Sequence, residues 1–146
     1  HQFDKVELVR YETPERSREA LEELTQEAEA VLQRLGLAYR VVILAAGDLG
    51  FSSAMTYDLE VWAPGVEKWL EVSSCSVFTD YQARRANLRF RPGPGQKPAY
   101  LHTLNGSGLA LPRLMVALPE SYQDESGGVA IPEALQAHTG FSRLDP

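Results

Sequence analysis

The sequence predicts an α+β domain in which an antiparallel β-sheet is flanked by helices. Three observations lead to this fold class. A long segment near the start repeats apolar residues at helical spacing. Several later runs have strand-like composition and are separated by short turn sequences, which is typical of strands joined by hairpins. Near residue 109, a strand pattern leads directly into a second helix. This combination favours an α+β arrangement.

The first predicted elements are a strand and a long helix. Residues 3–9 alternate apolar and polar side chains, which indicates a half-buried strand. Thr13 is placed to cap the following helix, and Pro14 suits its first position. The helix extends for about six turns to Gly36, a residue type suited to the left-handed conformation after a helix. Its apolar stripe consists of Leu21, Leu24, Ala28, Val31, Leu32 and Leu35.

The middle of the chain contains strand patterns separated by loops. Strands are predicted at 39–45, 57–62 and 69–76. Residues 47–53 form a flexible loop by composition. Residues 80–91 are basic and are compatible with helix, strand or both. The proline- and glycine-rich residues 91–98 cannot hold a helix or a central strand, so they predict a hairpin tip or a loop.

The last part of the chain combines strand, glycine-containing segment and helix. Residues 100–104 predict a strand that runs into Asn105-Gly106-Ser107-Gly108, followed by a helix from about Leu109 to Tyr122. Pro112 falls in the first turn, where proline is tolerated, whereas Pro119 is expected to end or kink the helix. A short terminal helix is expected near residues 132–137.

Length and composition limit the possible classes of protein. The 146 residues suit one domain with its own core. With 14 Lys+Arg against 20 Asp+Glu, the net charge of −6 argues against general affinity for nucleic-acid phosphates, although a local basic face remains compatible. Cys75 is the single cysteine, which excludes an intrachain disulfide and a multi-cysteine zinc site. No apolar run approaches the ~18–20 residues that a membrane helix needs.

Residues 71–76 bring a carboxylate, hydroxyls and a thiol onto one predicted strand. In a regular strand, Glu71, Ser73 and Cys75 share one face, and Ser74 and Ser76 share the other. The segment is either an edge strand of small residues or a site for a hard cation such as Mg²⁺ beside a nucleotide phosphate. To bring Glu71 and Ser74 to one ion, the strand would need a twist or a bulge.

Three other features have both a structural and a functional interpretation. Residues 105–108 are either a turn or a place where free amides at a helix start receive a polar ligand. Arg113 lies near the positive end of a helix, so it is either a solvated residue or the partner of an anionic ligand. The basic cluster of Arg84, Arg85, Arg89 and Arg91 is either a solvated face or a phosphate contact.

The histidines His1, His102 and His138 have neither metal spacing nor an obvious nucleophile partner. Residue patterns alone therefore predict a nucleotide-binding α+β enzyme.

Six segments, taken together in their order and spacing, resemble the seryl-tRNA synthetase family. They are residues His1–Glu7, Gly47–Gly50, Thr56–Trp62, Glu71–Ser76, Asp80–Asn87 and His102–Ala110. The resemblance implies a class II synthetase fold, an antiparallel sheet flanked by helices that is incomplete at its N-terminus. Residues 1–146 would be the C-terminal part of this catalytic domain, from the second half of motif 2 through motif 3.

The resemblance implies the activity of a serine–tRNA ligase. The serine carboxylate attacks the α-phosphate of ATP, giving seryl-adenylate and pyrophosphate, and serine then passes to the terminal ribose of tRNA(Ser). Motif 1, the motif 2 arginine and the tRNA-binding coiled coil do not occur in this sequence. Because of this and the start on His1-Gln2-Phe3 without methionine, we expect a fragment of a larger enzyme that is weakly active or inactive by itself. The full enzyme is expected to be a cytoplasmic homodimer that does not associate with membranes.

The resemblance also implies roles for individual residues. Phe3 offers an apolar face for adenine, opposite Arg113, the expected catalytic residue, which stacks on the base and meets phosphate oxygens. Glu7 suits the substrate ammonium group, and Ser107 with Asn105 hydrogen-bonds the serine hydroxyl. Glu71 and Ser74 are the expected Mg²⁺ ligands. The expected ATP-binding set is His1, Gln2, Phe3, Glu71, Val72, Ser73, Ser74 and Arg113.

Two alternatives stay open. The chain could be a non-catalytic synthetase-like domain that binds a nucleotide, an amino acid or a protein, or a free-standing serine ligase for another acceptor. The joint presence of Glu7, Glu71, Ser74, Ser107 and Arg113 argues against a binding relic, which has no evident need for all five. Ala46, where the family usually has Thr, and Pro119 within motif 3 depart from the family pattern.

Overall fold

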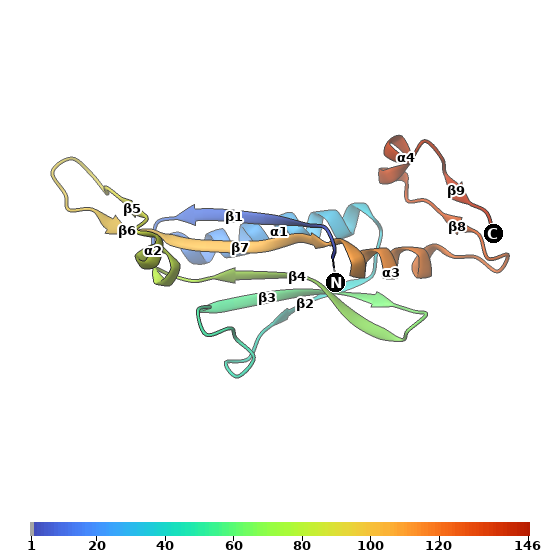
Figure 1. Cartoon of the computed structure of the whole chain (residues 1–146), viewed down its shortest axis with the longest axis horizontal. Coiled ribbons are helices and arrows are strands. Elements are labelled where there is room, and N and C mark those ends of the chain that lie inside the picture. The colour runs from blue at the N-terminus through green and yellow to red at the C-terminus, as the bar shows by residue number, and fades with distance from the viewer. Residues whose placement is uncertain (1) are drawn as a thin grey trace.

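The computed structural model, which describes residues 2–146, contains a five-stranded antiparallel sheet with helices packed around it (Figure 1). The strand order is β1-β7-β4-β3-β2. These strands span Lys5–Glu12 (β1), Tyr39–Ile43 (β2), Met55–Ala63 (β3), Lys68–Val77 (β4) and His102–Ala110 (β7). The sequence-based prediction of an antiparallel sheet flanked by helices is therefore confirmed.

Four helices and two small two-stranded sheets complete the described chain. The helices are α1 (Ser17–Arg34), α2 (Tyr81–Ala86), α3 (Leu111–Tyr122) and α4 (Glu133–Thr139). One sheet pairs β5 (Arg89–Phe90) with β6 (Ala99–Tyr100) as a hairpin, and the other pairs β8 (Val129–Ala130) with β9 (Arg143–Leu144) across the intervening α4. Residues 80–91 thus form both helix and strand, and residues 91–98 form the predicted hairpin tip. In residues 2–146, no helix has the length and hydrophobicity to cross a bilayer.

The apolar stripe of α1, apart from the exposed Val31, covers one face of the sheet and forms the main core. Leu21 and Leu32 are fully buried and belong to the same cluster as Leu59 of β3 and Leu104 of β7. Burying each such leucine stabilises the fold by about 1.5–3 kcal/mol. Because side chains alternate along a strand, Asn105 and the residues two apart from it face away from α1, toward the open face of the sheet.

The start of α1 differs from the prediction. Thr13 was expected to cap the helix and Pro14 to begin it, but α1 begins at Ser17, and the preceding residues form a turn. The backbone N–H of Thr13 donates to the Glu12 side chain at 2.9 Å, while the Ser17 hydroxyl donates to the Pro14 carbonyl at 3.0 Å. Ser17 also lies 2.8 Å from Nδ1 of His102 on β7. Contacts with the sheet therefore fix where this helix begins.

The predicted boundary between the last long strand and its helix is also wrong. Residues 105–108 were expected to be a strand end feeding a helix at Leu109, but they lie inside β7, and α3 starts at Leu111. The strand continues because β1 pairs with β7 as far as Ala110. The argument from free amides at a helix start fails for these residues, since they lie within the paired strand.

The α3 helix passes through Pro119 and ends at Tyr122 rather than stopping at the proline. Proline removes one N–H from the helical ladder, but residues beyond it make tertiary contacts that hold the last turn. The Glu120 side chain accepts a hydrogen bond from the Gly65 backbone N–H at 2.9 Å. The Tyr122 hydroxyl donates to the Leu35 carbonyl at 2.6 Å. Pro112 lies in the first turn, as predicted.

A one-residue bulge in β4 changes which side chains reach the open face. Leu59 of β3 pairs with Ser73, but the next residue, Glu60, pairs with Glu71, so Val72 is an extra residue in β4. Asp58 pairs with Ser74. Because Asp58 and Glu60 share a face of β3, their partners Ser74 and Glu71 also share a face. The regular-strand assignment of Glu71 to the face of Ser73 and Cys75 is therefore wrong, and the bulge required for a joint Glu71–Ser74 site is present.

Candidate functional site

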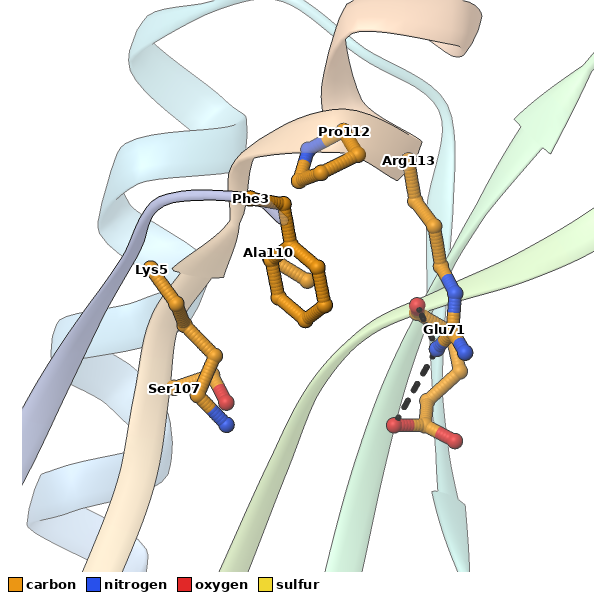
Figure 2. Close-up of a pocket in the computed structure, with 7 residues that line it drawn as sticks. All are labelled: Phe3, Lys5, Glu71, Ser107, Ala110, Pro112 and Arg113. Atoms are coloured by element: carbon orange, nitrogen blue, oxygen red, sulfur yellow. Dashed lines mark hydrogen bonds and ion pairs between the residues drawn. The ribbon is translucent and has the colours of Figure 1, made fainter. Parts of the chain in front are cut away.

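A cavity of about 250 Å³ opens between the start of β1, the middle of β4 and the first turn of α3 (Figure 2). Figure 2 shows the Phe3 ring near its centre, with Lys5 and Ser107 on one side and Arg113 and Glu71 on the other. The cavity is lined by Phe3, Lys5, Glu71, Ser107, Ala110, Pro112 and Arg113. Four residues that the sequence predicted for one site, from segments up to 110 positions apart, are thus brought together.

Arg113 contacts Glu71 in two ways. One guanidinium nitrogen, Nη1, donates to the Glu71 main-chain carbonyl at 2.7 Å and lies 3.4 Å from the carboxylate oxygen Oε1. This contact offsets the unfavourable position of a cation at the start of α3. Both side chains are about half exposed, 53% for Arg113 and 45% for Glu71, so the ion pair contributes only about 0–1 kcal/mol. An anionic ligand can therefore replace Glu71 at the guanidinium with little loss of stability.

Glu7 and Ser107 face each other across β1 and β7. They are paired in the register of the two strands, and the Ser107 hydroxyl lies 3.4 Å from Oε2 of Glu7. Lys5 forms an ion pair with the same carboxylate at 3.0 Å. Glu7 stands beside the cavity rather than in its lining. A carboxylate held this way can accept hydrogen bonds from an ammonium group of a ligand, and the hydroxyl can hydrogen-bond to a small polar group of the same ligand.

The structure does not bring every predicted residue to the cavity. Val72 is completely buried, and the Ser73 hydroxyl donates to the Ser107 carbonyl at 2.6 Å, so neither side chain lines it. Gln2 is exposed and outside the lining, as are the half-buried Ser74 and Asn105. Asn105 still lies on the open face, because its neighbour Leu104 on β7 faces the core beneath α1. His1 lies outside the described residues.

Two residues at the site were given no role from the sequence. Lys5 lines the cavity, and its place at the start of a strand carries no signal for ligand binding. Asp58 faces Ser74 across β3 and β4, and its Oδ1 is buried without a hydrogen-bond partner among residues 2–146. A buried carboxylate oxygen without a donor is costly. The alternation of residues 57–62 predicts that Asp58 points away from the core. That its Oδ1 lacks a hydrogen-bond donor among residues 2–146 can be seen only in the folded structure.

The donor set on the open face suits a hard cation. Glu71 and Ser74 share this face because of the Val72 bulge, and Asp58 adds a carboxylate oxygen that no donor among residues 2–146 satisfies. Mg²⁺ prefers a small number of carboxylate and hydroxyl oxygens together with water and phosphate. Among the described residues, no group of three or more His, Cys, Asp or Glu side chains forms a metal cage. The arrangement therefore fits an ion held partly by a nucleotide.

Cys75 and His102 have structural positions. Cys75 is buried, and burial raises the pKa of its thiol, so it is a poor nucleophile. His102 contacts Ser17 at the start of α1, away from the cavity. Neither residue supplies a base or nucleophile to the site, whose chemistry depends on charge and hydrogen bonding.

Comparison with known proteins identifies close relatives. Residues 1–122 match the family model described as tRNA synthetase class II core domain (G, H, P, S and T). The chain is 66% identical over 144 residues to a serine–tRNA ligase from Gemmatimonas aurantiaca, covering 99% of this chain and 34% of that protein. It is 59% identical over 145 residues to the serine–tRNA ligase of Prosthecochloris aestuarii, again covering 99% of this chain and 34% of the relative. The chain thus spans about a third of the length of the curated relatives that it matches.

Solved structures of seryl-tRNA synthetases also superpose closely on this chain. A seryl-tRNA synthetase from Pyrococcus horikoshii, crystallised in complex with ATP, superposes with a TM-score of 0.96 at 47% identity. The match covers 100% of this chain and 33% of that one. A cytoplasmic serine–tRNA ligase from Naegleria fowleri in complex with AMP superposes with a TM-score of 0.92 at 35% identity, over 99% of this chain and 35% of that one.

Proposed function

The chain belongs to the family of tRNA synthetase class II core domains (G, H, P, S and T), and we propose that it forms part of the catalytic domain of a serine–tRNA ligase. The proposed reaction joins the serine carboxylate to the α-phosphate of ATP with release of pyrophosphate, and then transfers serine from the adenylate to the terminal ribose of tRNA(Ser) with release of AMP. The proposal includes a cytoplasmic homodimer. The observation that carries it is the cavity in which Phe3, Glu71, Ser107 and Arg113 converge.

The cavity supports a nucleotide site with an apolar side and a charged side. The exposed Phe3 ring, with Ala110 and Pro112 beside it, offers a surface for adenine. Arg113 reaches the cavity from α3 and can exchange its weak contact with Glu71 for a phosphate oxygen, which its planar guanidinium binds well. Lys5 adds a second cation that the sequence did not predict. Alignment and charge neutralisation of this kind are the main requirements of phosphoryl chemistry.

The open face beside this cavity supports a magnesium site. Glu71 and Ser74 would hold the ion, as the resemblance implied, and Asp58 is an additional oxygen in the same register. A magnesium ion here would neutralise phosphate charge during activation. The protein's part is to keep these oxygens on one face, which the Val72 bulge achieves.

The Glu7–Ser107 pair supports selection of serine. Glu7 is suited to the substrate ammonium group, while Ser107, with Asn105 two residues away on the same strand face, can hydrogen-bond the serine hydroxyl. A site that pairs a substrate hydroxyl rejects an analogue without it by as much as about 10⁴–10⁵-fold, because its polar groups are then left unpaired. Alanine should therefore be a poor substrate.

The deciding experiment is serine-dependent ATP–pyrophosphate exchange by the complete natural protein that contains these residues. Arg113→Gln should lower the exchange rate by about 100-fold or more, as does loss of one transition-state donor in other enzymes. Arg18→Gln removes an exposed arginine of α1 and serves as the charge-matched control, with no expected effect. Ser107→Ala should narrow the preference for serine over alanine.

The alternative of a non-catalytic binding domain gives a different result in the same preparation. It predicts binding of a non-hydrolysable seryl-adenylate analogue by calorimetry but no pyrophosphate exchange with any amino acid. Absence of serine-dependent exchange in the complete protein would refute the ligase proposal. Exchange that responds equally to serine and alanine would refute the assignment of the serine pocket.

A further inference from the structure

A short segment of the chain has a charge opposite to that of the rest. Residues 80–100 contain five of the 14 Lys+Arg residues but one of the 20 Asp+Glu residues. The chain as a whole has a net charge of −6, so this segment is a strongly positive region in an acidic protein. It comprises α2 and the β5–β6 hairpin, which Figure 1 shows at the end of the sheet opposite α3.

The arginines of this segment lie against aromatic rings. The guanidinium groups of Arg84 and Arg89 both lie over the ring of Tyr100, at 4.8 and 4.7 Å from its centre. Arg85 lies over the ring of Tyr81 at 3.5 Å. Phe51, from the β2–β3 loop, contacts Tyr81 edge-on at 5.8 Å and is 91% exposed. We call this set the arginine–aromatic cluster; it consists of Phe51, Tyr81, Arg84, Arg85, Arg89 and Tyr100.

Most of the positive charge in the cluster is not neutralised by the protein. Asp80 pairs with Arg84 at 2.5 Å. Within the described part of the chain, Arg85 and Arg89 have no carboxylate partner, and both are exposed. The rings hold the guanidinium planes in place, which reduces the entropy lost when these donors bind a ligand. Fixed guanidinium forks beside an exposed aromatic ring match phosphate oxygens together with an unpaired base.

The cluster lies on the same side of the sheet as the cavity. The Thr103 hydroxyl donates to the Gln82 side chain of α2 at 2.7 Å, and Thr103 shares the open face of β7 with Ser107. Tyr100 and Ser107 are separated by seven residues of nearly extended chain, or about 23 Å at ~3.3 Å per residue. A few unpaired nucleotides can span such a distance, so one RNA strand can contact the cluster and end at the cavity.

We infer that the arginine–aromatic cluster is an RNA-binding surface that holds backbone phosphates and stacks one unpaired base of the tRNA whose 3′ end enters the cavity. This inference rests on the proposed function for the identity of the RNA. Arg85 and Arg89 contact phosphates, and the exposed ring of Phe51 receives the base. The surface increases the affinity for the tRNA and positions its 3′ end, but it takes no part in amino-acid activation.

The test measures binding of a fluorescently labelled tRNA(Ser) transcript to the complete natural protein by anisotropy, over a range of salt concentrations. Each lost phosphate contact lowers the slope of log affinity against log salt by ~0.7–0.9. The double variant Arg85→Gln/Arg89→Gln should therefore lower the slope by about 1.4–1.8. The control Arg18→Gln/Arg34→Gln removes the same charge from exposed positions on α1 and should leave the slope unchanged.

A second variant separates stacking from charge. Phe51→Ala should weaken binding roughly 5- to 150-fold at every salt concentration, the effect of losing one stacked base, without changing the slope. Phe51 is almost fully exposed, so this variant should keep the stability of the unmodified protein. Serine-dependent pyrophosphate exchange should be the same in all these variants.

The outcomes separate this inference from the proposed function. An unchanged salt slope in Arg85→Gln/Arg89→Gln, or unchanged RNA affinity in Phe51→Ala, would overturn the inference. So would a loss of self-association in these variants with RNA binding intact, because the cluster would then be a protein interface. Absence of pyrophosphate exchange in the unmodified protein would refute the ligase function, whereas the anisotropy measurement would still decide whether the cluster binds RNA.

Discussion

Gly106 is the position at which a single added methyl group should do most damage to the centre of the sheet. A Cβ built on Gly106 would lie 2.6 Å from Sγ of Cys75 and 3.3 Å from both its Cα and Cβ. Gly106 is a buried residue of β7 next to β4, and its φ angle is not left-handed. The predicted effect of Gly106→Ala is therefore steric and comes from the contact with Cys75.

The size of the effect follows from this geometry. Ordinary contact begins near 3.4 Å, so Sγ would have to move by about 0.8 Å or more. Rotation of the thiol cannot relieve the contacts with Cα and Cβ of Cys75, so the two strands must also separate slightly. Overpacking of this kind costs about 1–3 kcal/mol. The same shift would displace Ser107, and misplacement by ~1 Å can slow catalysis by about 100-fold.

The assay is urea unfolding followed by circular dichroism, with four proteins in a double-mutant cycle. Gly106→Ala should lose about 1–3 kcal/mol of unfolding free energy. Cys75→Ala removes the closest atom, so the coupling between the two changes should be about 1–2 kcal/mol in the direction of rescue. Gly47→Ala is the control, because a Cβ there meets nothing within 4 Å. That variant should be neutral or more stable by up to ~1 kcal/mol.

Two results would refute the reasoning. The first is a Gly106→Ala protein that is no less stable than Gly47→Ala. The second is an additive cycle, in which Cys75→Ala gives no rescue. Either would show that β4 and β7 can move apart freely, and that the close approach at Gly106 does not position Ser107.

Three further outcomes follow from contacts outside the cavity. Because burial raises the pKa of Cys75, iodoacetamide at pH 8 should label it slowly in the folded protein and rapidly in urea, as measured by mass spectrometry. Arg143 and a Ser126 hydroxyl hold the pKa of Asp124 well below its ordinary 3.8, so the stability that this link contributes is complete above that pH and is lost as the pH falls from there through the lowered pKa; amide exchange in the β8–β9 sheet should then increase. Tyr122→Phe removes the hydrogen bond to Leu35 and should cost about 0.5–1.5 kcal/mol in thermal unfolding, with an unchanged melting temperature counting against a role for this bond.

The sequence predicted the elements whose signals are local. The apolar stripe of α1 is visible at its own spacing, and Gly36 ends the helix region with a positive φ of 65° as expected. The strand patterns at 57–62 and 69–76 correspond to β3 and β4. In these segments the residue pattern and the burial favour the same type of element.

The errors occur where distant segments decide the structure. Thr13 has the chemistry of a cap, but the contact of Ser17 with His102, 85 residues away, determines where α1 begins. The bulge at Val72 is defined by the register with β3, and no pattern within 69–76 reveals it. The unpaired oxygen of Asp58 likewise depends on what surrounds it. The resemblance to a family named most site residues, but only the folded sheet shows which of them meet.

The pairing of β1 with β7 has a consequence for the order of events on the ribosome. Within residues 2–146, β1 pairs with β7 alone, and Glu7 is 100 residues away from its partner Ser107. At ~5–20 residues per second, β1 emerges about 5–20 s before its partner strand is made. During that interval β1 cannot form its contacts with β7, including the pairing of Glu7 with Ser107. The cavity is therefore completed late, because the residues at the start of β1 that line it are synthesised about 100 residues before those of β7 and α3.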